Sequence, residues 1–310
     1  MSNPYIAVVG GCNFDIYATS AHPLIGADSN PGHVCTAPGG VGRNIAENLS
    51  RLGLATKMLT ALGADAFGNA IIQQAEQTGL DLSACLRLPH VSTSVYVCIN
   101  QNDGDIAVAV SDMGICEQIN PSYLQKCSNI LDEAALVVAD ANLTEEALHF
   151  LSHHYGSKLC VDCVSGAKAG KLKSILKDLY CVKANRSEAA IISGISVENA
   201  CDAAKAAERL HHLGIQVVIV TLGEYGAYVS DGTVGCAKPL MPGETINTSG
   251  CGDAFFAGAL MALLESLSTE QILRYGLSMA RLCAASQSAV SPAVSHDRLL
   301  ETIQNYKEDV

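Results

Sequence analysis

The residues best suited to chemistry lie in one short stretch, Asn247 to Phe255, which reads Asn-Thr-Ser-Gly-Cys-Gly-Asp-Ala-Phe. It runs directly into an apolar segment of helical period, residues 254–267, so the pattern predicts a loop that ends in a helix N-terminus. Gly250 and Gly252 carry no Cβ, so the amides around them can approach a ligand closely. Amides at a helix start lack helical acceptors and lie at the positive end of the helix dipole, which makes this loop a candidate anion site.

Asp253 is the single carboxylate of this stretch. Its charge would repel a bound anion, so it is not suited to be a second clamp on that anion. It is suited to be a general base that takes a proton from an attacking hydroxyl. The alternative is structural: Ser249 or Asp253 serves only as a helix N-cap, and the glycines only form a turn.

A second glycine loop, Gly39-Gly-Val-Gly-Arg-Asn44, opens another predicted helix over residues 43–52. The apolar run at 5–11 predicts a buried strand, and Asn13 and Asp15 follow at its carboxyl end. Together with Asn44 they supply carboxylate and amide groups suited to vicinal hydroxyls. The spacing is not G-x-G-x-x-G, and no Walker A motif is present, so the dinucleotide and P-loop fingerprints are absent. By itself the loop is typical of an ordinary turn.

Two further motifs follow predicted strands of the second half. Asn185 and Glu188 face the same way on a first helical turn, where they could hold a hydrated Mg²⁺ near phosphates. As an isolated motif the pair is more typical of a capping box, with Glu188 reaching back to the cap residue. Thr221-Leu-Gly-Glu-Tyr-Gly226 ends a long apolar run and by itself reads as a strand followed by a turn.

Alternating elements must position these motifs. Predicted strands at 135–139, 159–162, 179–182 and 216–221 are separated by predicted helices at 121–132, 144–155, 167–176 and 186–212. Such βαβ alternation predicts an α/β fold with a mostly parallel sheet covered by helices on both faces. Residues 94–99 and 106–110 read as a hairpin, and residues 18–38 read as irregular. We therefore expect one domain over residues 1–310, with a small β lid formed by about 13–38 and 92–112 at the ligand edge of the large sheet.

Composition excludes several classes of protein. The 310 residues carry 19 basic and 31 acidic side chains, a net charge of −12, with no basic cluster. This argues against binding to nucleic acid or to an anionic membrane, because both depend on neutralising phosphates. The 13 cysteines are scattered without any C-x-x-C, the first residues lack a signal pattern, and the apolar runs are too short to span a bilayer. A reduced cytoplasm is the expected location.

The order of the motifs resembles a known family. The resemblance lies in the order of four motifs: Gly-Gly-x-Gly-x-Asn-x-Ala, Asn-x-x-Glu, Thr-x-Gly-x-x-Gly and Asn-Thr-x-Gly-x-Gly-Asp. Over Tyr5 to about Ser291, the chain resembles the ribokinase-like sugar and nucleoside kinases of the phosphofructokinase-B family. Within that family, four segments look most like the pseudouridine kinase subfamily. They are Asp28-Ser-Asn-Pro-Gly32, Pro38-Gly-Gly-Val-Gly-Arg-Asn-Ile-Ala46, Ser111-Asp-Met113 and Val138-Ala-Asp-Ala-Asn142.

The resemblance implies a three-layer α/β/α kinase that uses ATP and Mg²⁺ to phosphorylate the 5′-hydroxyl of pseudouridine. Two alternatives to this predicted function remain: a kinase of the same fold that acts on ribose or adenosine, and a nucleoside-binding protein without catalytic activity. Asp253 would be the base, and the amides of Gly250, Cys251 and Gly252 would form the anion hole. On the nucleotide side, Asn185 and Glu188 would position Mg²⁺ and phosphates, and Thr221, Gly223 and Gly226 would line the ATP site.

On the substrate side, the resemblance places Asn13, Asp15, Gly39, Gly40 and Asn44 around the ribose. Asp28, Ser29, Asn30 and Asp112, from the lid, are the expected readers of the uracil edge. Asn247 stands where many members carry an aspartate that helps to hold a monovalent cation, so the departure puts a K⁺ site in doubt. Cys251 replaces the commoner alanine and could be somewhat acidified near a helix start. Pairing of lid edges between subunits, as in other members, would give a homodimer.

Overall fold

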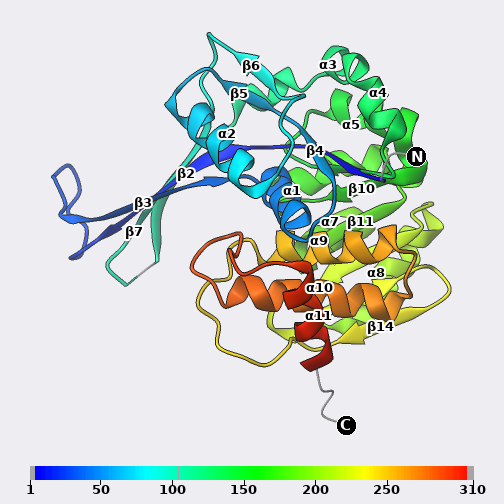
Figure 1. The fold of residues 1–310 in the computed structure, drawn as a ribbon. Helices are drawn as coiled ribbons and strands as arrows, with labels where there is room; N and C mark the ends of the chain where they lie inside the picture. Colours follow the sequence, from blue (N-terminus) through cyan, green and yellow to red (C-terminus); the bar gives the residue numbers. More distant parts are fainter. Residues whose placement is uncertain (1–3, 104, 306–310) are drawn as a thin grey trace.

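A computed structural model describes residues 4–103 and 105–305 (Figure 1). Within these residues the largest sheet has eight strands in the order β14-β13-β12-β11-β10-β9-β1-β4. In chain order they are β1 (Ile6–Val9), β4 (Thr56–Leu59), β9 (Leu136–Asp140), β10 (Leu159–Asp162), β11 (Cys181–Asn185), β12 (Val217–Thr221), β13 (Ala227–Ser230) and β14 (Gly235–Lys238). All pairs from β4 to β12 are parallel, and β13 and β14 extend the sheet antiparallel.

Helices cover both faces of this sheet because successive strand residues point to opposite sides. Ile6 and Val8 of β1 belong to one core cluster, while Ala7 and Val9 belong to the other. The first face carries α1 (Val41–Arg51), α2 (Ala66–Thr78), α9 (Cys251–Leu264) and α10 (Thr269–Ala284). The second face carries α3 (Pro121–Lys126), α5 (Glu145–Tyr155), α7 (Arg186–Ser193) and α8 (Ala200–His212), with α4 (Ser128–Glu133) and α6 (Gly166–Ala169) beside them. The α11 helix (His296–Asn305) packs on α10.

A four-stranded sheet projects from this body, seen at the left of Figure 1. Its order is β3-β2-β7-β8, and we call it the small sheet. The strands are β2 (Asn13–Ser20), β3 (Gly32–Gly39), β7 (Ser94–Asn100) and β8 (Ile106–Asp112). β5 (Ala61–Gly63) and β6 (Leu86–Leu88) form a separate pair near its base. Short 3₁₀ helices lie at Gly114–Gln118, Gly156–Lys158, Gly170–Ser174, Leu176–Asp178 and Gly223–Tyr225.

The predicted fold class, a mostly parallel sheet between helices with a smaller sheet beside it, is confirmed. Four local predictions were wrong. The helix predicted over 121–132 is interrupted at Cys127 and forms α3 and α4. Residues 18–38 are not irregular, because they contribute to β2 and β3; six successive residues of β3 are exposed, so no apolar alternation marks the strand. Helix 186–212 is two helices, since Gly194 ends α7 in a left-handed conformation and the Asn199 side chain caps α8. Residues 167–176 are mainly 3₁₀ rather than one α-helix.

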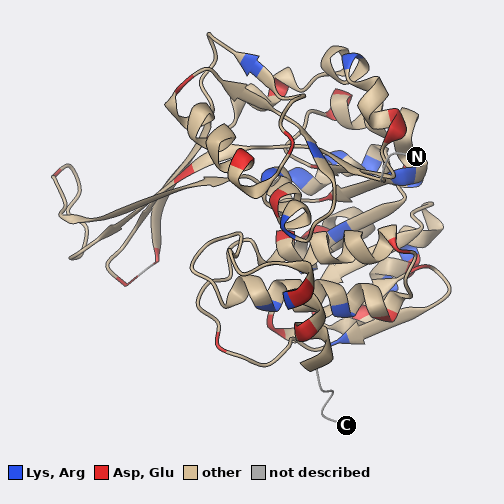
Figure 2. Cartoon of the chain, in the orientation of Figure 1, with Lys and Arg blue, Asp and Glu red and all other residues tan. Residues whose placement is uncertain are grey.

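The distribution of basic residues differs between the two parts. Lysines and arginines lie over the large sheet and its helices, and the two segments that build the small sheet, residues 13–39 and 92–112, contain none (Figure 2). Among the described residues, no helix combines the length and apolarity that crossing a bilayer requires. All thirteen cysteines are free thiols.

Candidate active site

Asp253 lies in the first turn of α9, directly after the glycine loop. Gly250 is the N-cap and has φ +78°, a left-handed conformation that glycine adopts without strain. The Cys251 amide donates to the Thr248 carbonyl at 3.3 Å, whereas the backbone amides of Gly252 and Asp253 donate to no acceptor within the described part of the chain. These two amides therefore remain free to bind an anion at the helix start, and the Cys251 amide is partly engaged.

The second glycine loop brings Asn44 to Asp253. The Asn44 Nδ2 donates a 2.8 Å hydrogen bond to Asp253 Oδ2, across the contact between α1 and α9. Arg43 Nη1 donates to Asn44 Oδ1 at 3.1 Å and to the Pro38 carbonyl at 2.8 Å. Because Arg43 can only donate, it fixes the orientation of the Asn44 amide, so that the amide nitrogen faces the carboxylate. The two sequence motifs thus form one site.

Burial raises the pKa of the Asp253 carboxyl to about 7. The nearby Asp162 and Asp140 carboxylates also raise the pKa, while Lys183 and the hydrogen bond from Asn44 lower it. The side chain retains 8% of its exposure, so it is nearly enclosed but still reaches the surface of the site. A carboxyl that titrates near neutral pH is matched to accepting a proton from a hydroxyl.

Lys183 and Asp162 form a buried ion pair beneath the loop, which the sequence reasoning missed. The Lys183 Nζ lies 2.9 Å from Asp162 Oδ2, and both side chains are nearly inaccessible. A Cβ built on Gly252 would come within 2.9 Å of the same Nζ, so the ammonium sits against the anion loop. Burial lowers the pKa of Lys183, but the carboxylates of Asp162, Asp253 and Glu188 outweigh it and hold the pKa above its ordinary value. The lysine therefore supplies a fixed positive charge next to the loop.

A charged residue inside an otherwise apolar strand was the available signal for this pair. Lys183 interrupts β11, and Asp162 ends β10 in register with it. The sequence reasoning also gave Asp140 no role, although it too is a charged residue that ends an apolar strand, β9. Asp140 is fully buried, and its Oδ2 accepts hydrogen bonds from the amides of Gly11 (2.9 Å) and Gly42 (2.8 Å). Asp140 thereby joins the end of β1 to the start of α1.

The predicted ribose group lies where the small sheet joins the body. Asn13 and Asp15 are hydrogen-bonded to each other, Nδ2 to Oδ1. Gly39 and Gly40 lack side chains where a Cβ would collide with Asp15 and with Asn13, respectively. Burial raises the pKa of Asp15, and the charge of Arg43 lowers it. The structure therefore brings Asn13, Asp15, Gly39 and Gly40 together, and Arg43 links this group electrostatically to Asp253.

The predicted nucleotide group surrounds one cavity of about 610 Å³ on the other side of the glycine loop. Its polar lining includes Asn185, Thr221, Gly223, Gly226, Cys251 and Gly252. Its apolar lining includes Leu240, Met241, Phe255, Leu277 and Ala280. A mainly apolar cavity that opens onto free amides of a helix start suits a molecule with a flat ring and an anionic tail.

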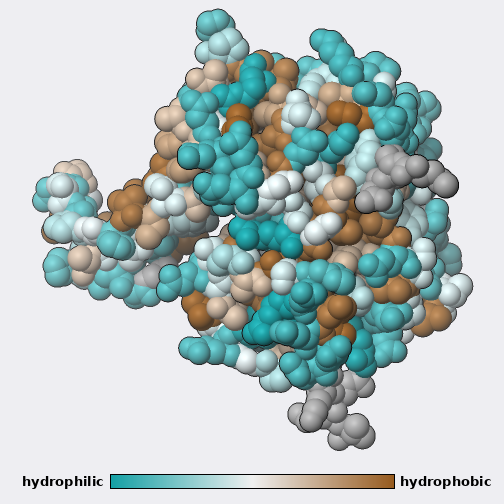
Figure 3. Space-filling model, viewed as in Figure 1, coloured by the Kyte–Doolittle hydropathy of each residue, from teal (hydrophilic) through white to brown (hydrophobic). Residues whose placement is uncertain are grey.

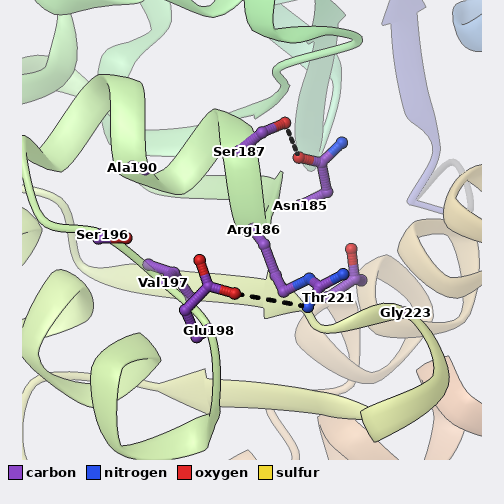
Figure 4. A pocket seen from close by; sticks show the side chains of 9 residues that line it. All are labelled: Asn185, Arg186, Ser187, Ala190, Ser196, Val197, Glu198, Thr221 and Gly223. Atoms are coloured by element: carbon purple, nitrogen blue, oxygen red, sulfur yellow. Dashed lines mark hydrogen bonds and ion pairs between the residues drawn. The ribbon is translucent and has the colours of Figure 1, made fainter.

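A shallower hollow of about 450 Å³ adjoins this cavity around Arg186 (Figure 4). The two share Asn185, Thr221 and Gly223. Asn185 and Glu188 form the capping box that was the structural alternative: Glu188 Oε2 accepts from the Asn185 amide at 2.8 Å, and Asn185 Oδ1 accepts from the Glu188 amide at 3.0 Å. The capped Glu188 side chain is buried behind Asn185, and its charge acts on Lys183.

The structure does not bring the four predicted base-reading residues to this site. Asp28, Ser29 and Asn30 lie in the exposed connection between β2 and β3, where Asn30 bonds the Ile25 backbone and Asp28 accepts from the Ser29 amide. Asp112 pairs with Val95, whereas Asp15 pairs with Tyr96 and Tyr96 with Ser111. Asp112 therefore lies on the opposite face of the small sheet from Asp15.

Asn247 and Cys251 hold the loop in place. The Asn247 Nδ2 donates to the Gln287 carbonyl at 2.9 Å, and its Oδ1 accepts from the Ser249 amide at 2.9 Å. Its amide thus joins the glycine loop to the segment after α10, a bond that an aspartate could not donate. Cys251 interacts with Cys283, and this hydrogen bond lowers the pKa of the Cys251 thiol. Within the described ranges, no group of three or more His, Cys, Asp or Glu side chains is arranged to hold a metal ion by itself.

The chain is similar to several known proteins over nearly its whole length. The model of the pfkB family carbohydrate kinases matches residues 3–296. The chain belongs to this family. It is 33% identical to a pseudouridine kinase of Escherichia coli K12 over 304 residues, which cover 97% of each chain. A carbohydrate kinase from Agrobacterium tumefaciens superimposes with a TM-score of 0.85 at 27% identity, covering 97% of both chains. The fold is also that of an Arabidopsis thaliana ribokinase solved with ribose and ATP, with a TM-score of 0.86 at 22% identity, covering 97% of this chain and 99% of the ribokinase.

Proposed function

We propose that this PfkB-family kinase transfers the γ-phosphoryl group of ATP to the 5′-hydroxyl of pseudouridine. The observation that carries the proposal is the position of Asp253, between the polar group at Asn13 and Asp15 and a cavity that suits a nucleotide. The full-length likeness to a pseudouridine kinase supports the choice of nucleoside. The ATP site proposed for Asn185, Thr221, Gly223 and Gly226 corresponds to that cavity.

The chemical step is an in-line displacement without a covalent enzyme intermediate. The 5′-oxygen forms a bond to the γ-phosphorus while the bond from that phosphorus to the β,γ-bridging oxygen breaks, and ADP leaves. Asp253 accepts the proton of the 5′-hydroxyl as the new bond forms. The free amides of Gly252 and Asp253, together with the Lys183 ammonium beside them, stabilise charge on the transferred group. The protein therefore acts through position and electrostatics.

Mg²⁺ fits the nucleotide side in the way that this ion usually binds. It commonly keeps several waters and takes one or two carboxylates together with phosphate oxygens. Asn185 lines the cavity, and the buried Glu188 behind it accepts hydrogen bonds from Asn185 on both carboxylate oxygens. Asn185 would thus face the hydrated ion, and the charge of Glu188 would favour the cation, which would neutralise phosphate charge when ATP is bound.

The small sheet would serve as a lid over the ribose. Its inner face carries Asn13 and Asp15, so closure onto the body would exclude water from the site. Contact of Asp28, Ser29 and Asn30 with the uracil edge would require the exposed tip of the sheet to fold over the site. Asp112 would need, in addition, to turn across the sheet, which makes it the weakest of the proposed contacts.

A substrate panel tests the proposal directly. Purified protein is incubated with ATP, Mg²⁺ and, in turn, pseudouridine, uridine, adenosine or ribose, and ADP release is measured with product identification by mass spectrometry. Pseudouridine is expected to have the highest kcat/KM and to give a 5′-phosphate. A higher kcat/KM for ribose or adenosine would replace pseudouridine as the substrate, and binding without ADP release from any of them would indicate a non-catalytic binding protein.

We also propose a homodimer formed through the outer face of the small sheet. Val34, Val108 and Val110 share this face and are 51–63% exposed, and hydrophobic residues gather on the projecting arm in Figure 3. An apolar surface of this kind on a part without basic residues is typical of a protein interface. Val108→Lys should convert the dimer to a monomer in light scattering, whereas Val234→Lys, at an exposed valine of the large domain, should not. A monomeric parent protein would refute the dimer.

A further inference from the structure

Two tyrosines lie beside the ribose group on the inner face of the small sheet and have no role in the proposed chemistry. Tyr17 is two residues beyond Asp15 on β2, and Tyr96 pairs with Asp15 from β7. Since alternate residues of a strand share a face, Asp15, Tyr17 and Tyr96 all lie on one side of the sheet. Their rings meet edge to face, with centroids 6.2 Å apart and planes at 65°.

The position of the Tyr17 ring is fixed by a hydrogen bond. The Tyr17 hydroxyl donates to Asp15 Oδ2 at 3.3 Å, so the ring is tied to the carboxylate of the ribose group. Both tyrosines are half-buried, and neither belongs to a hydrophobic core cluster. A structural role in the core therefore does not account for them.

The residues that flank the two rings on this face are small. Ala37 pairs with Asp15 and Cys35 with Tyr17 on one side, while Ser111 pairs with Tyr96 and Ala109 with Cys98 on the other. Ala37, Cys35, Ser111 and Ala109 are exposed. Large side chains at these four positions would fill the space above the sheet. The small side chains that are present leave this face open, so that the two rings stand above their neighbours.

The chemistry of a ribonucleoside matches this arrangement. The 5′-carbon and the base leave the ribose ring on opposite sides of the ring oxygen. When the 5′-hydroxyl points to Asp253 and the ring is held near Asp15, the base points away from the body and along the small sheet. Tyr17 is the next residue in that direction on this face, and Tyr96 lies beside Asp15 on β7 with its ring against that of Tyr17.

We infer that Tyr17 and Tyr96 form the surface on which the planar base of a nucleoside substrate stacks, so that they distinguish a nucleoside from a free sugar. The inference rests on the proposed nucleoside kinase activity. An aromatic ring offers such stacking to any base, so the two tyrosines would add affinity for nucleosides as a class. Selection among bases would depend on other groups.

The test compares Tyr17→Ala and Tyr96→Ala with the parent enzyme, using pseudouridine, uridine and ribose as acceptors. Each alanine variant should raise the KM for the nucleoside about tenfold or more, the scale of one lost base–aromatic stack. The KM for ATP, measured in the same variants, serves as the internal reference. Tyr96→Phe keeps the ring and should keep the parent KM for the nucleoside. Tyr17→Phe keeps the ring but loses the hydrogen bond to Asp15, so its KM should lie between those of the parent and Tyr17→Ala.

Tyr96→Leu separates stacking from packing, because leucine fills space without offering an aromatic face. It should behave as the alanine variant does, with a melting temperature close to that of the parent. Alanine and leucine variants that keep the parent KM for nucleosides would overturn the inference while leaving the kinase assignment intact. A parent enzyme that phosphorylates ribose but no nucleoside would overturn the proposed function and the inference together.

Discussion

The hydrogen bond from Asn44 to Asp253 gives the most specific test of the catalytic site. Replacing Asn44 with alanine removes the 2.8 Å bond that stabilises the ionised carboxylate. A hydrogen bond to a charged group contributes about 1.5–3 kcal/mol. Because about 1.4 kcal/mol corresponds to one pKa unit, the pKa of Asp253 should rise from about 7 to about 8–9.

The consequence for catalysis has a definite sign. Asp253 acts as a base only when it is ionised, so a higher pKa reduces the active fraction at neutral pH. At pH 7 that fraction should fall from about one half to between about a tenth and a hundredth. The kcat of Asn44→Ala should therefore drop about 5- to 50-fold at pH 7 and recover as the pH approaches 9.

The assay is the pH profile of kcat at saturating ATP and nucleoside, which separates this effect from lost affinity for the ribose. Asn48→Ala is the matched control: Asn48 is a buried amide one turn later on α1, and it donates to the Asn44 carbonyl at 2.8 Å rather than to Asp253. The control should keep the midpoint of the profile near 7. An Asn44→Ala profile with the parent midpoint would refute the reasoning.

Three other perturbations follow from the same structure. The pKa of Asp253 is raised from 3.8 to about 7, so the stability that this group contributes is full below pH 4 and is lost as the pH rises through 7, by up to about 4 kcal/mol. The Asp253→Asn variant should therefore have a higher melting temperature than the parent at pH 8, and the difference should be smaller at pH 5. Equal differences at both pH values would contradict the burial argument. Gly226→Ala should lower the free energy of unfolding in urea by about 2 kcal/mol or more, because φ of Gly226 is +91° and an added Cβ would collide with the Lys238 carbonyl. Gly170→Ala is the control, because a Cβ at Gly170 would meet open space and should leave stability nearly unchanged. Similar effects of the two substitutions would refute the strain argument. Ala280→Phe should fill part of the nucleotide cavity and raise the KM for ATP about tenfold with little effect on the KM for nucleoside, and an unchanged KM for ATP would place ATP elsewhere.

Both glycine loops and the fold class could be predicted from local patterns in the sequence. A helix start and a glycine without Cβ are properties of a few neighbouring residues, so Gly250 and Asp253 could be identified without coordinates. The alternation of strands and helices is similarly local, and it implies a parallel sheet through general rules of chain connection. The order of motifs then indicated the family that the comparisons established.

Long-range pairing explains what the sequence did not reveal. Lys183 and Asp162 come from adjacent strands, and their register decides that they meet beneath Gly252. The strand β3 has no buried apolar side, so only its pairing with β2 makes it a strand. Asn185 and Glu188 show the converse: the local capping box was visible as an alternative, but the cavity beside it was not.

Single-turnover phosphoryl transfer by Asp253→Asn tests the central claim most directly. Excess enzyme is mixed with γ-labelled ATP and pseudouridine at pH 8, and the binding of both ligands is measured in parallel by calorimetry. Loss of the general base should slow transfer about 10²- to 10⁴-fold, while both dissociation constants stay within a few-fold of the parent values. Transfer within about fivefold of the parent rate would show that Asp253 is not the base.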